Sequence, residues 1–133
     1  MVDIEAEMVL IEQLVNENVE ADKSKDLDRI MNLFADDIVY PVSGFPPVVG
    51  KEDLRNFIDG SFDQLDDLIM VSEKMEVSSV GDLAYNVGWF KMRNTGMDDY
   101  VHFKYLLVLK KCFGVWKIVA ESYSLNSCEA RAF

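Results

Sequence analysis

The chain has 133 residues, half of them hydrophobic, which is the size of one domain that buries its own core. Its 13 Lys and Arg against 24 Asp and Glu give a net charge of −11, which repels nucleic acids and anionic membranes. Two Cys and one His cannot supply an ordinary zinc site, so neither a metal nor a cofactor is expected. No apolar run spans a bilayer and the acidic start lacks a secretory signal, which predicts a cytoplasmic protein.

The N-terminal part of the chain predicts two helices. Apolar residues recur at three- and four-residue spacing from Ile4 to about Asp22, the pattern of an amphipathic helix that lays one stripe on a core. After a polar break the same spacing returns over residues 27–34, where Asp26 or Ser24 can serve as the N-cap. We therefore expect a long first helix and a shorter second one.

A strand, a loop and a third helix are predicted next. Residues 38–42 are mostly β-branched or aromatic, and residues 43–50 hold two Gly and two Pro, which interrupt regular structure. Helical spacing then marks a third helix over residues 54–62, and the acidic residues before it suit the positive end of its dipole. Gly60 weakens the last turn of this helix.

The C-terminal half changes to the two-residue period of strands. Alternation and turn signals place four antiparallel strands at about residues 68–79, 83–93, 100–111 and 115–125. The predicted fold class is therefore α+β, with three N-terminal helices packed on a curved, mainly antiparallel sheet.

Side-chain parity distinguishes the two faces of the strand over residues 100–111. Its odd residues, from Val101 to Leu109, are apolar or aromatic and form the set that faces the core. Its even residues are mixed, which is typical of an outer face that a second copy partly covers. A homodimer through the outer sheet face is the expected assembly.

Three stretches resemble a known family. They are LFADDIVYPVSGFPPVVGKEDLRNFI (Leu33–Ile58), GDLAYNVGWF (Gly81–Phe90) and KYLLVLKKCFGVWKIVAESYSLN (Lys104–Asn126). Together they resemble the ketosteroid isomerase-like and SnoaL-like proteins of the nuclear transport factor 2-like superfamily. The resemblance implies a cone-shaped α+β domain over residues 1–126, with a C-terminal tail over 127–133. It also implies a deep, largely apolar pocket for a small-molecule ligand and, usually, a homodimer.

The catalytic groups of two enzymes in this superfamily do not carry over. Ketosteroid isomerase uses a carboxylate base on its first strand and a Tyr and a neutral Asp as oxyanion donors. Aligned on LFADD, these positions fall at Tyr40, Asn18 and near Tyr105. Scytalone dehydratase, which the chain also resembles locally, uses two pocket histidines, whereas this chain has only His102, placed by parity on the outer face. Both of those reactions are therefore disfavoured.

A candidate site follows from the pocket face that the resemblance implies. The catalytic candidates are Glu121 and Tyr105, and the ligand-binding candidates are Asn18, Tyr40, Trp89 and Tyr123. Among apolar neighbours the pKa of a Glu carboxyl rises toward the range of a general acid or base, and tyrosine hydroxyls can stabilise charge on a ligand oxygen. The structural alternatives are an ion pair between Glu121 and Lys117, tyrosines that bond only to the backbone, and a Trp89 that merely packs in the core.

Two functions remain open from the sequence. One is a cofactor-free acid-base enzyme of the isomerase, cyclase or dehydratase type, acting on an apolar or aromatic ligand with a carbonyl or hydroxyl. The other is a non-catalytic ligand-binding or association module, which the missing carboxylate at Tyr40 favours. A cavity that reaches Glu121 would support the enzyme, whereas a filled cavity and a water-exposed Glu121 would support the module.

Overall fold

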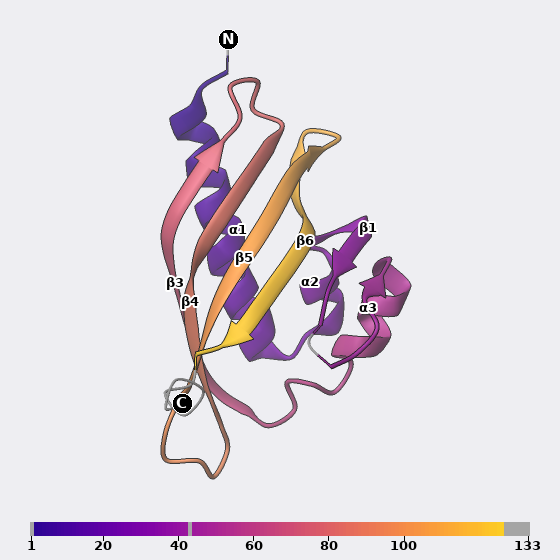
Figure 1. Cartoon of the computed structure of the whole chain (residues 1–133), viewed down its shortest axis with the longest axis vertical. Coiled ribbons are helices and arrows are strands. Elements are labelled where there is room, and N and C mark those ends of the chain that lie inside the picture. Colours follow the sequence, from indigo (N-terminus) through magenta and orange to yellow (C-terminus); the bar gives the residue numbers. More distant parts are fainter. Residues whose placement is uncertain (1, 43, 127–133) are drawn as a thin grey trace.

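Helices come first along the chain and a mixed sheet follows (Figure 1). The computed structural model describes residues 2–42 and 44–126, and the predicted tail lies outside them. The helices are α1 (Ile4–Ser24), α2 (Leu27–Met31) and α3 (Lys51–Ile58). The strands are β1 (Phe34–Tyr40), β2 (Val48–Val49), β3 (Leu65–Val77), β4 (Leu83–Asn94), β5 (Val101–Cys112) and β6 (Val115–Leu125). In Figure 1, α1 runs along the sheet, while α2 and α3 lie next to β1 at the right of the view.

The second helix is shorter than its apolar spacing predicts. Asp26 caps α2 as expected, its side chain accepting a hydrogen bond from the Arg29 backbone N–H at 3.2 Å. The helix ends at Met31 because Phe34 pairs with Ile118 on the neighbouring β6 and already belongs to β1. The expected helical role of Phe34 is therefore wrong: tertiary pairing takes this residue into the sheet.

The third helix also ends earlier than predicted. It stops at Ile58, and Gly60 follows in the left-handed region at φ +79°. Phe62, which continues the helical spacing, lies beyond this stop, yet it packs against the hydrophobic core from the loop. The predicted loop before α3 contains one short strand, β2, which pairs antiparallel with the end of β1.

The sheet has six strands in the order β2-β1-β6-β5-β4-β3. β3 to β6 are antiparallel neighbours, as predicted, whereas β1 joins the sheet parallel to β6. The sheet stays open and does not close into a barrel. The α+β architecture with N-terminal helices on a mainly antiparallel sheet is confirmed.

Bulges interrupt the ladders that join β3 to β4 and β5 to β6. Asp66 and Glu73 are extra residues in β3 and Val119 is an extra residue in β6, each lying between two residues whose partners are adjacent on the neighbouring strand. A bulge bends its strand and reverses which residues point to each face. Trp116 and Ile118 are buried before the bulge in β6, whereas Glu121 points to that inner side after it.

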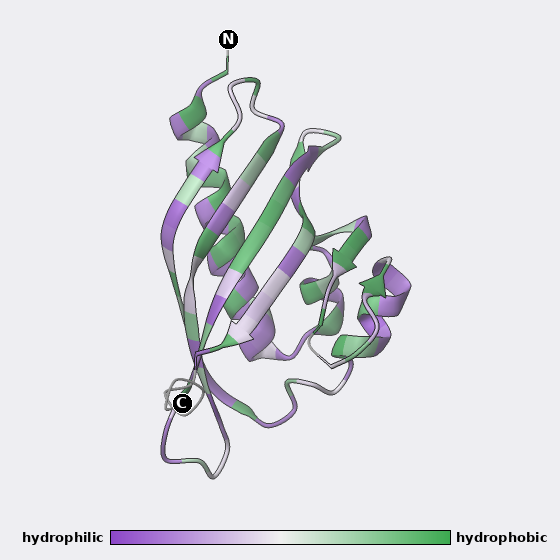
Figure 2. Cartoon of the chain, in the orientation of Figure 1, coloured by the Kyte–Doolittle hydropathy of each residue, from purple (hydrophilic) through white to green (hydrophobic). Residues whose placement is uncertain are grey.

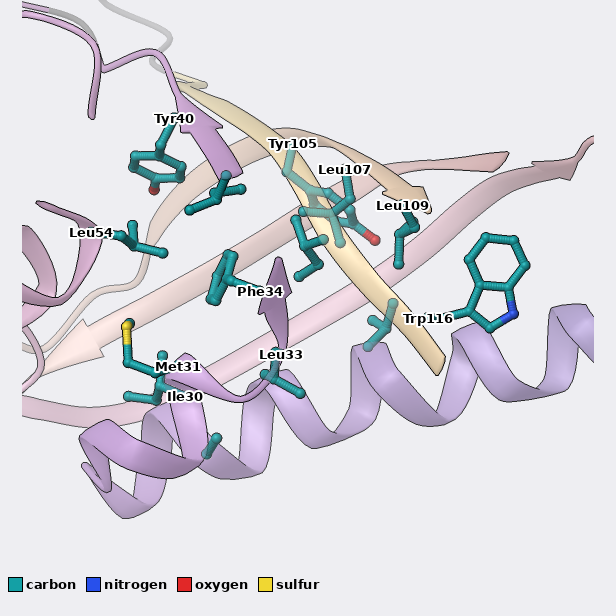
Figure 3. Close-up of a cluster of buried hydrophobic side chains, with 14 of the residues drawn as sticks. Ile30, Met31, Leu33, Phe34, Tyr40, Leu54, Tyr105, Leu107, Leu109 and Trp116 are labelled. Carbon is teal, nitrogen blue, oxygen red and sulfur yellow. The ribbon is translucent and has the colours of Figure 1, made fainter. Parts of the chain in front are cut away.

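The hydrophobic core lies between α1 and the inner face of the sheet. Ile11 and Val15 of α1 are buried there, and so are Tyr105, Leu107 and Leu109 of β5, which confirms the predicted parity. Figure 2 shows hydrophobic and hydrophilic residues alternating along α1, and Figure 3 shows the buried side chains of β1, β5 and α2 in one cluster. Burying this stripe against the sheet is the main source of stability.

A partly buried carboxylate fastens the start of α1 to the β5–β6 hairpin. Glu7 accepts hydrogen bonds from Lys111 Nζ and from Trp116 Nε1, both at 2.6 Å. These two donors lower the pKa of Glu7, Lys111 having the larger effect. The helix is thereby held in register at the end of the sheet away from α2 and α3 (Figure 1).

Gly88 is required on the inner face of β4. A Cβ atom at this position would overlap the backbone oxygen of Val71 and come within 2.9 Å of Tyr105 Oη. The Gly88→Ala variant is therefore expected to lose about 2 kcal/mol or more of unfolding free energy, because the backbone of β3 must move. Urea unfolding measures this loss, and Gly96→Ala, where a Cβ meets no atom within 4 Å but φ is +87°, gives for comparison the cost of backbone strain without a steric overlap. Equal stability of the Gly88→Ala variant and the wild type would contradict the packing described.

Candidate functional site

A cavity of about 280 Å³ opens between α1, the loop after α3 and the inner face of the sheet. Most of its lining is aliphatic or aromatic, as a binding site for a small apolar molecule requires. The polar side chains of the lining are Asn18, Asp22, Tyr40, Ser61, Tyr105, Glu121 and Tyr123. The described part of the chain contributes no Lys, Arg or His to this lining.

Glu121 reaches the cavity from β6, just beyond the bulge. Burial raises the pKa of its carboxyl to about 7. The alternative ion pair with Lys117 is wrong: Lys117 precedes the bulge, pairs with Lys110 on the other face, and its Nζ donates a hydrogen bond to the Asn32 backbone oxygen. Among the described residues, the bulge thus leaves Glu121 without a cation to neutralise it.

Asp22 is a second cavity carboxyl, which the candidates predicted from the sequence do not include. It lies in the last turns of α1 with only 8% of its surface exposed. Burial raises the pKa of Asp22 well above its usual range, and the negative charge of nearby Glu121 raises it further. A signal for it exists in the sequence, because Ile11, Val15, Asn18 and Asp22 follow one stripe at four- and three-residue spacing.

Two tyrosines stand beside these carboxyls. Tyr40 enters from β1 and Tyr123 from β6, and their ring centroids lie 5.9 Å apart. Burial raises the pKa of Tyr40, and the negative charge of Glu121 raises it further, so its hydroxyl stays protonated and can only act as a hydrogen-bonding group. Tyr123 is more open, with 38% of its surface exposed, and forms part of the cavity wall.

Tyr105 presents its ring to the cavity, but its hydroxyl is already in use. Tyr105 Oη donates a hydrogen bond of 2.6 Å to Asn86 Oδ1, and the fully buried Asn86 amide donates onward to Ser72 Oγ and the Lys74 backbone oxygen. Burial raises the pKa of Tyr105 to about 12. Figure 3 shows its oxygen directed away from Tyr40. This geometry indicates that Tyr105 forms part of the cavity wall and holds Asn86 in place. It does not favour the expected hydrogen bond from the Tyr105 hydroxyl to a ligand.

Of the remaining ligand-binding candidates, Asn18 lies in the cavity and Trp89 lies on the outer face of the sheet. Asn18 is buried on α1 and lines the cavity, with its amide 3.8 Å from Met70 Sδ. The expected pocket position of Trp89 is wrong: it pairs with Lys104 on the outer face, and its ring lies 6.5 Å from that of His102. His102 itself is exposed on that face, as parity predicts.

The described residues contain neither a cluster of metal ligands nor a membrane-spanning helix. Within residues 2–42 and 44–126, no three His, Cys, Asp or Glu side chains gather where they could hold a metal ion. In that same part of the chain, none of the helices has the length and apolar character needed to cross a membrane.

Solved structures share this architecture. A ketosteroid isomerase-like protein from Erwinia carotovora atroseptica superposes with a TM-score of 0.78 at 23% identity, over 91% of this chain and 97% of that one. A nuclear transport factor 2-like protein of unknown function from Shewanella oneidensis gives 0.77 at 19% identity, over 88% and 98%. A candidate scytalone dehydratase from Novosphingobium aromaticivorans gives 0.75 at 15% identity, over 92% and 85%. At these identities the likeness shows the fold and leaves the reaction open.

A family model agrees with the structural comparison. No curated protein matches the chain. The model of the SnoaL-like domain, however, matches residues 11–126, from the buried stripe of α1 to the end of β6. The chain therefore belongs to the SnoaL-like domain family and has the nuclear transport factor 2-like fold.

Proposed function

We propose that the cavity binds a small apolar or aromatic molecule with a carbonyl or hydroxyl group, and that Glu121 and Asp22 perform acid-base chemistry on it without a cofactor. The observation that carries this proposal is the pair of carboxyl groups in an apolar cavity with no basic side chain in its described lining. Groups arranged in this way are typical of proton-transfer sites. Buried carboxyls otherwise cost stability, which a purely structural site would avoid.

The two carboxyls have different tasks in this proposal. Burial raises the pKa of both, and the charge of whichever carboxyl ionises first keeps the other neutral; we assign the first ionisation to Glu121. Near neutral pH, Glu121 is then the base and Asp22 the neutral acid.

For an enolisable ketone, the Glu121 carboxylate takes an α-proton while Asp22 donates a hydrogen bond to the carbonyl oxygen. The electrons of the broken C–H bond move into the enolate, whose oxygen carries the negative charge. The protonated Glu121 then returns the proton to the same or a conjugated carbon, which regenerates the carboxylate. Asn18, Tyr40 and Tyr123 hold the molecule, and Tyr105 supports the wall.

Deuterium exchange into 2-tetralone, an aromatic ketone with acidic α-protons, tests this proposal without knowledge of the natural substrate. Proton NMR in D₂O at pD near 7.5 is expected to show loss of the α-proton signal faster with protein than with buffer alone. Binding of the ketone without faster exchange would contradict the enzyme and leave the non-catalytic ligand-binding module. A ketone that neither binds nor exchanges would contradict both.

We also propose a homodimer through the outer face of the sheet, together with a cytoplasmic location. Apolar side chains on that face remain exposed, including Ile69, Val71 and Leu106 at 36–41%. Light scattering after gel filtration is expected to give twice the 15.2 kDa of one chain, and the Leu106→Glu variant is expected to give the single mass. A wild-type protein of single mass would contradict the dimer.

A further inference from the structure

Four aromatic side chains gather in one part of the cavity wall. Tyr123, two residues further along β6, has its ring centroid 5.6 Å from that of Phe103, 5.8 Å from that of Phe90 and 5.9 Å from that of Tyr40. All of these rings line the cavity. The negative faces of such rings attract a positive charge placed over them.

The charges of the cavity have one sign. Asp22 is nine-tenths buried and lines the cavity, and its carboxyl has no hydrogen-bond or ion-pair partner among the described residues. Glu121 shares that cavity, and the described lining holds no basic residue. The net charge of −11 adds an attractive field for cations around the molecule. An anionic ligand would meet the charge of Glu121 with no basic side chain in the described lining to offset it.

We infer that the cavity selects an organic cation: an aromatic or alicyclic molecule whose ammonium group lies between Asp22, Glu121 and the ring of Tyr123. A small inorganic cation fits less well, because aromatic walls cannot replace its shell of water oxygens. This inference rests on the proposed function only in that both require a ligand to enter the same cavity. It adds a charge requirement that acid-base chemistry on a neutral ketone does not need.

Phenyltrimethylammonium and tert-butylbenzene form the matched pair of probes, because they have nearly the same shape and differ in charge. NMR titration at pH 7.5 is expected to show at least ten-fold tighter binding of the cation. Benzoate, the anionic probe, is expected to bind more weakly than either. Equal binding of the cation and tert-butylbenzene would overturn the inference.

Substitutions of the two cavity carboxyls identify which of them binds the cation. Glu121→Gln is expected to weaken binding of the cation at least five-fold while leaving tert-butylbenzene unchanged, and Asp22→Asn is expected to weaken it by a smaller factor, because Asp22 is neutral near pH 7.5 until a cation binds beside it. Glu76→Gln, the same kind of change at an exposed position on β3, is the control and is expected to have no effect. Cation binding that survives both cavity substitutions would place the cation elsewhere and overturn the inference.

Proton release provides a readout that is independent of catalysis. A bound cation favours the ionised form of Glu121, so calorimetry near pH 6.5 in two buffers of different ionisation heat is expected to detect protons released by phenyltrimethylammonium. The other titratable groups that share the cavity are Asp22 on α1, Tyr40 on β1, Tyr105 on β5 and Tyr123 on β6. The release is expected to be much smaller in Glu121→Gln, and an unchanged release in that variant would overturn the assignment to this carboxyl.

The outcomes separate this inference from the proposed function. Exchange into 2-tetralone together with equal binding of the two probes overturns the cation preference and leaves the acid-base proposal standing. Tight binding of phenyltrimethylammonium without any exchange supports the cation site and overturns catalysis. Failure of both experiments overturns both.

Discussion

Replacing Glu121 with Gln is expected to lower the protein-catalysed exchange rate of 2-tetralone by at least about 100-fold, because a positioned general base contributes roughly that much to a proton transfer. Gln keeps the shape of the side chain but cannot accept the proton. The rate in the wild-type protein is expected to rise with pH through about 7, where Glu121 ionises. It is expected to fall again where Asp22 loses its proton.

The control for this prediction is Glu76→Gln, which removes a carboxyl of the same kind from an exposed position on β3. Asp22→Asn keeps a hydrogen-bond donor at the proposed acid and is expected to retain more activity than Asp22→Leu. If Glu121→Gln exchanges the ketone as fast as the wild type, Glu121 is not the base.

The second large effect is that Glu121→Gln is expected to make the protein more stable at alkaline pH, whereas most substitutions destabilise a protein. Burial raises the pKa of Glu121 from 4.5 to about 7, so the folded state binds this proton more tightly than the unfolded chain does. The resulting stabilisation is complete below pH 4.5 and is lost as the pH rises through about 7. Its size is about 3 kcal/mol, from 1.36 kcal/mol for each pKa unit.

Glu121→Gln removes this dependence because its side chain stays neutral. The variant is expected to be more stable than the wild type at pH 8 by up to about 3 kcal/mol, with a difference that vanishes toward pH 4.5. Asp22 acts in the same direction. Glu7, Glu17 and Asp67 act in the opposite direction, because their pKa values are lowered by hydrogen bonds and their contributions are lost in acid.

Urea unfolding of the wild type and of Glu121→Gln at several pH values between 5 and 8 measures this effect. The wild type is expected to be most stable near pH 5, where Glu121 is mostly protonated and the hydrogen-bonded carboxylates still carry their charge. A Glu121→Gln variant that is less stable than the wild type at pH 8 would contradict the buried position of the carboxyl.

Much of the fold could be predicted from periodicity. The apolar stripe of α1 and the alternation in β5 each follow from a simple repeat, and both are confirmed. The parallel pairing of β1 with β6 could not be predicted, because it depends on a contact between residues far apart in the sequence. The same contact takes Phe34 out of the second helix.

In the candidate site, too, some residues could be placed from the sequence and others could not. Continuing the stripe of α1 past Asn18 by one turn identifies Asp22, so the helical periodicity is enough to predict that Asp22 faces the cavity. Trp89 was harder to place, because both faces of β4 carry hydrophobic residues and the inner face also holds the polar Asn86 and the small Gly88. Alternation alone then gives no preference for either face.

The orientation of Glu121 depends on one extra residue. Val119 forms a bulge, which puts Lys117 and Glu121 on opposite faces although they stand four residues apart. A regular strand would have brought them to the same side, where the ion pair considered from the sequence could form. Bulges arise from the pairing of two strands and leave little trace in the sequence of one.

Titration of the Glu121 carboxyl by carbon-detected NMR tests the central claim most directly, with Glu121→Gln to assign the signal. The structure predicts a pKa of about 7, the value of a carboxyl held in an apolar cavity whose described lining holds no cationic side chain. A pKa near the ordinary ~4.3 of Glu would show a hydrated or paired carboxylate and would contradict both the base and the cavity built around it.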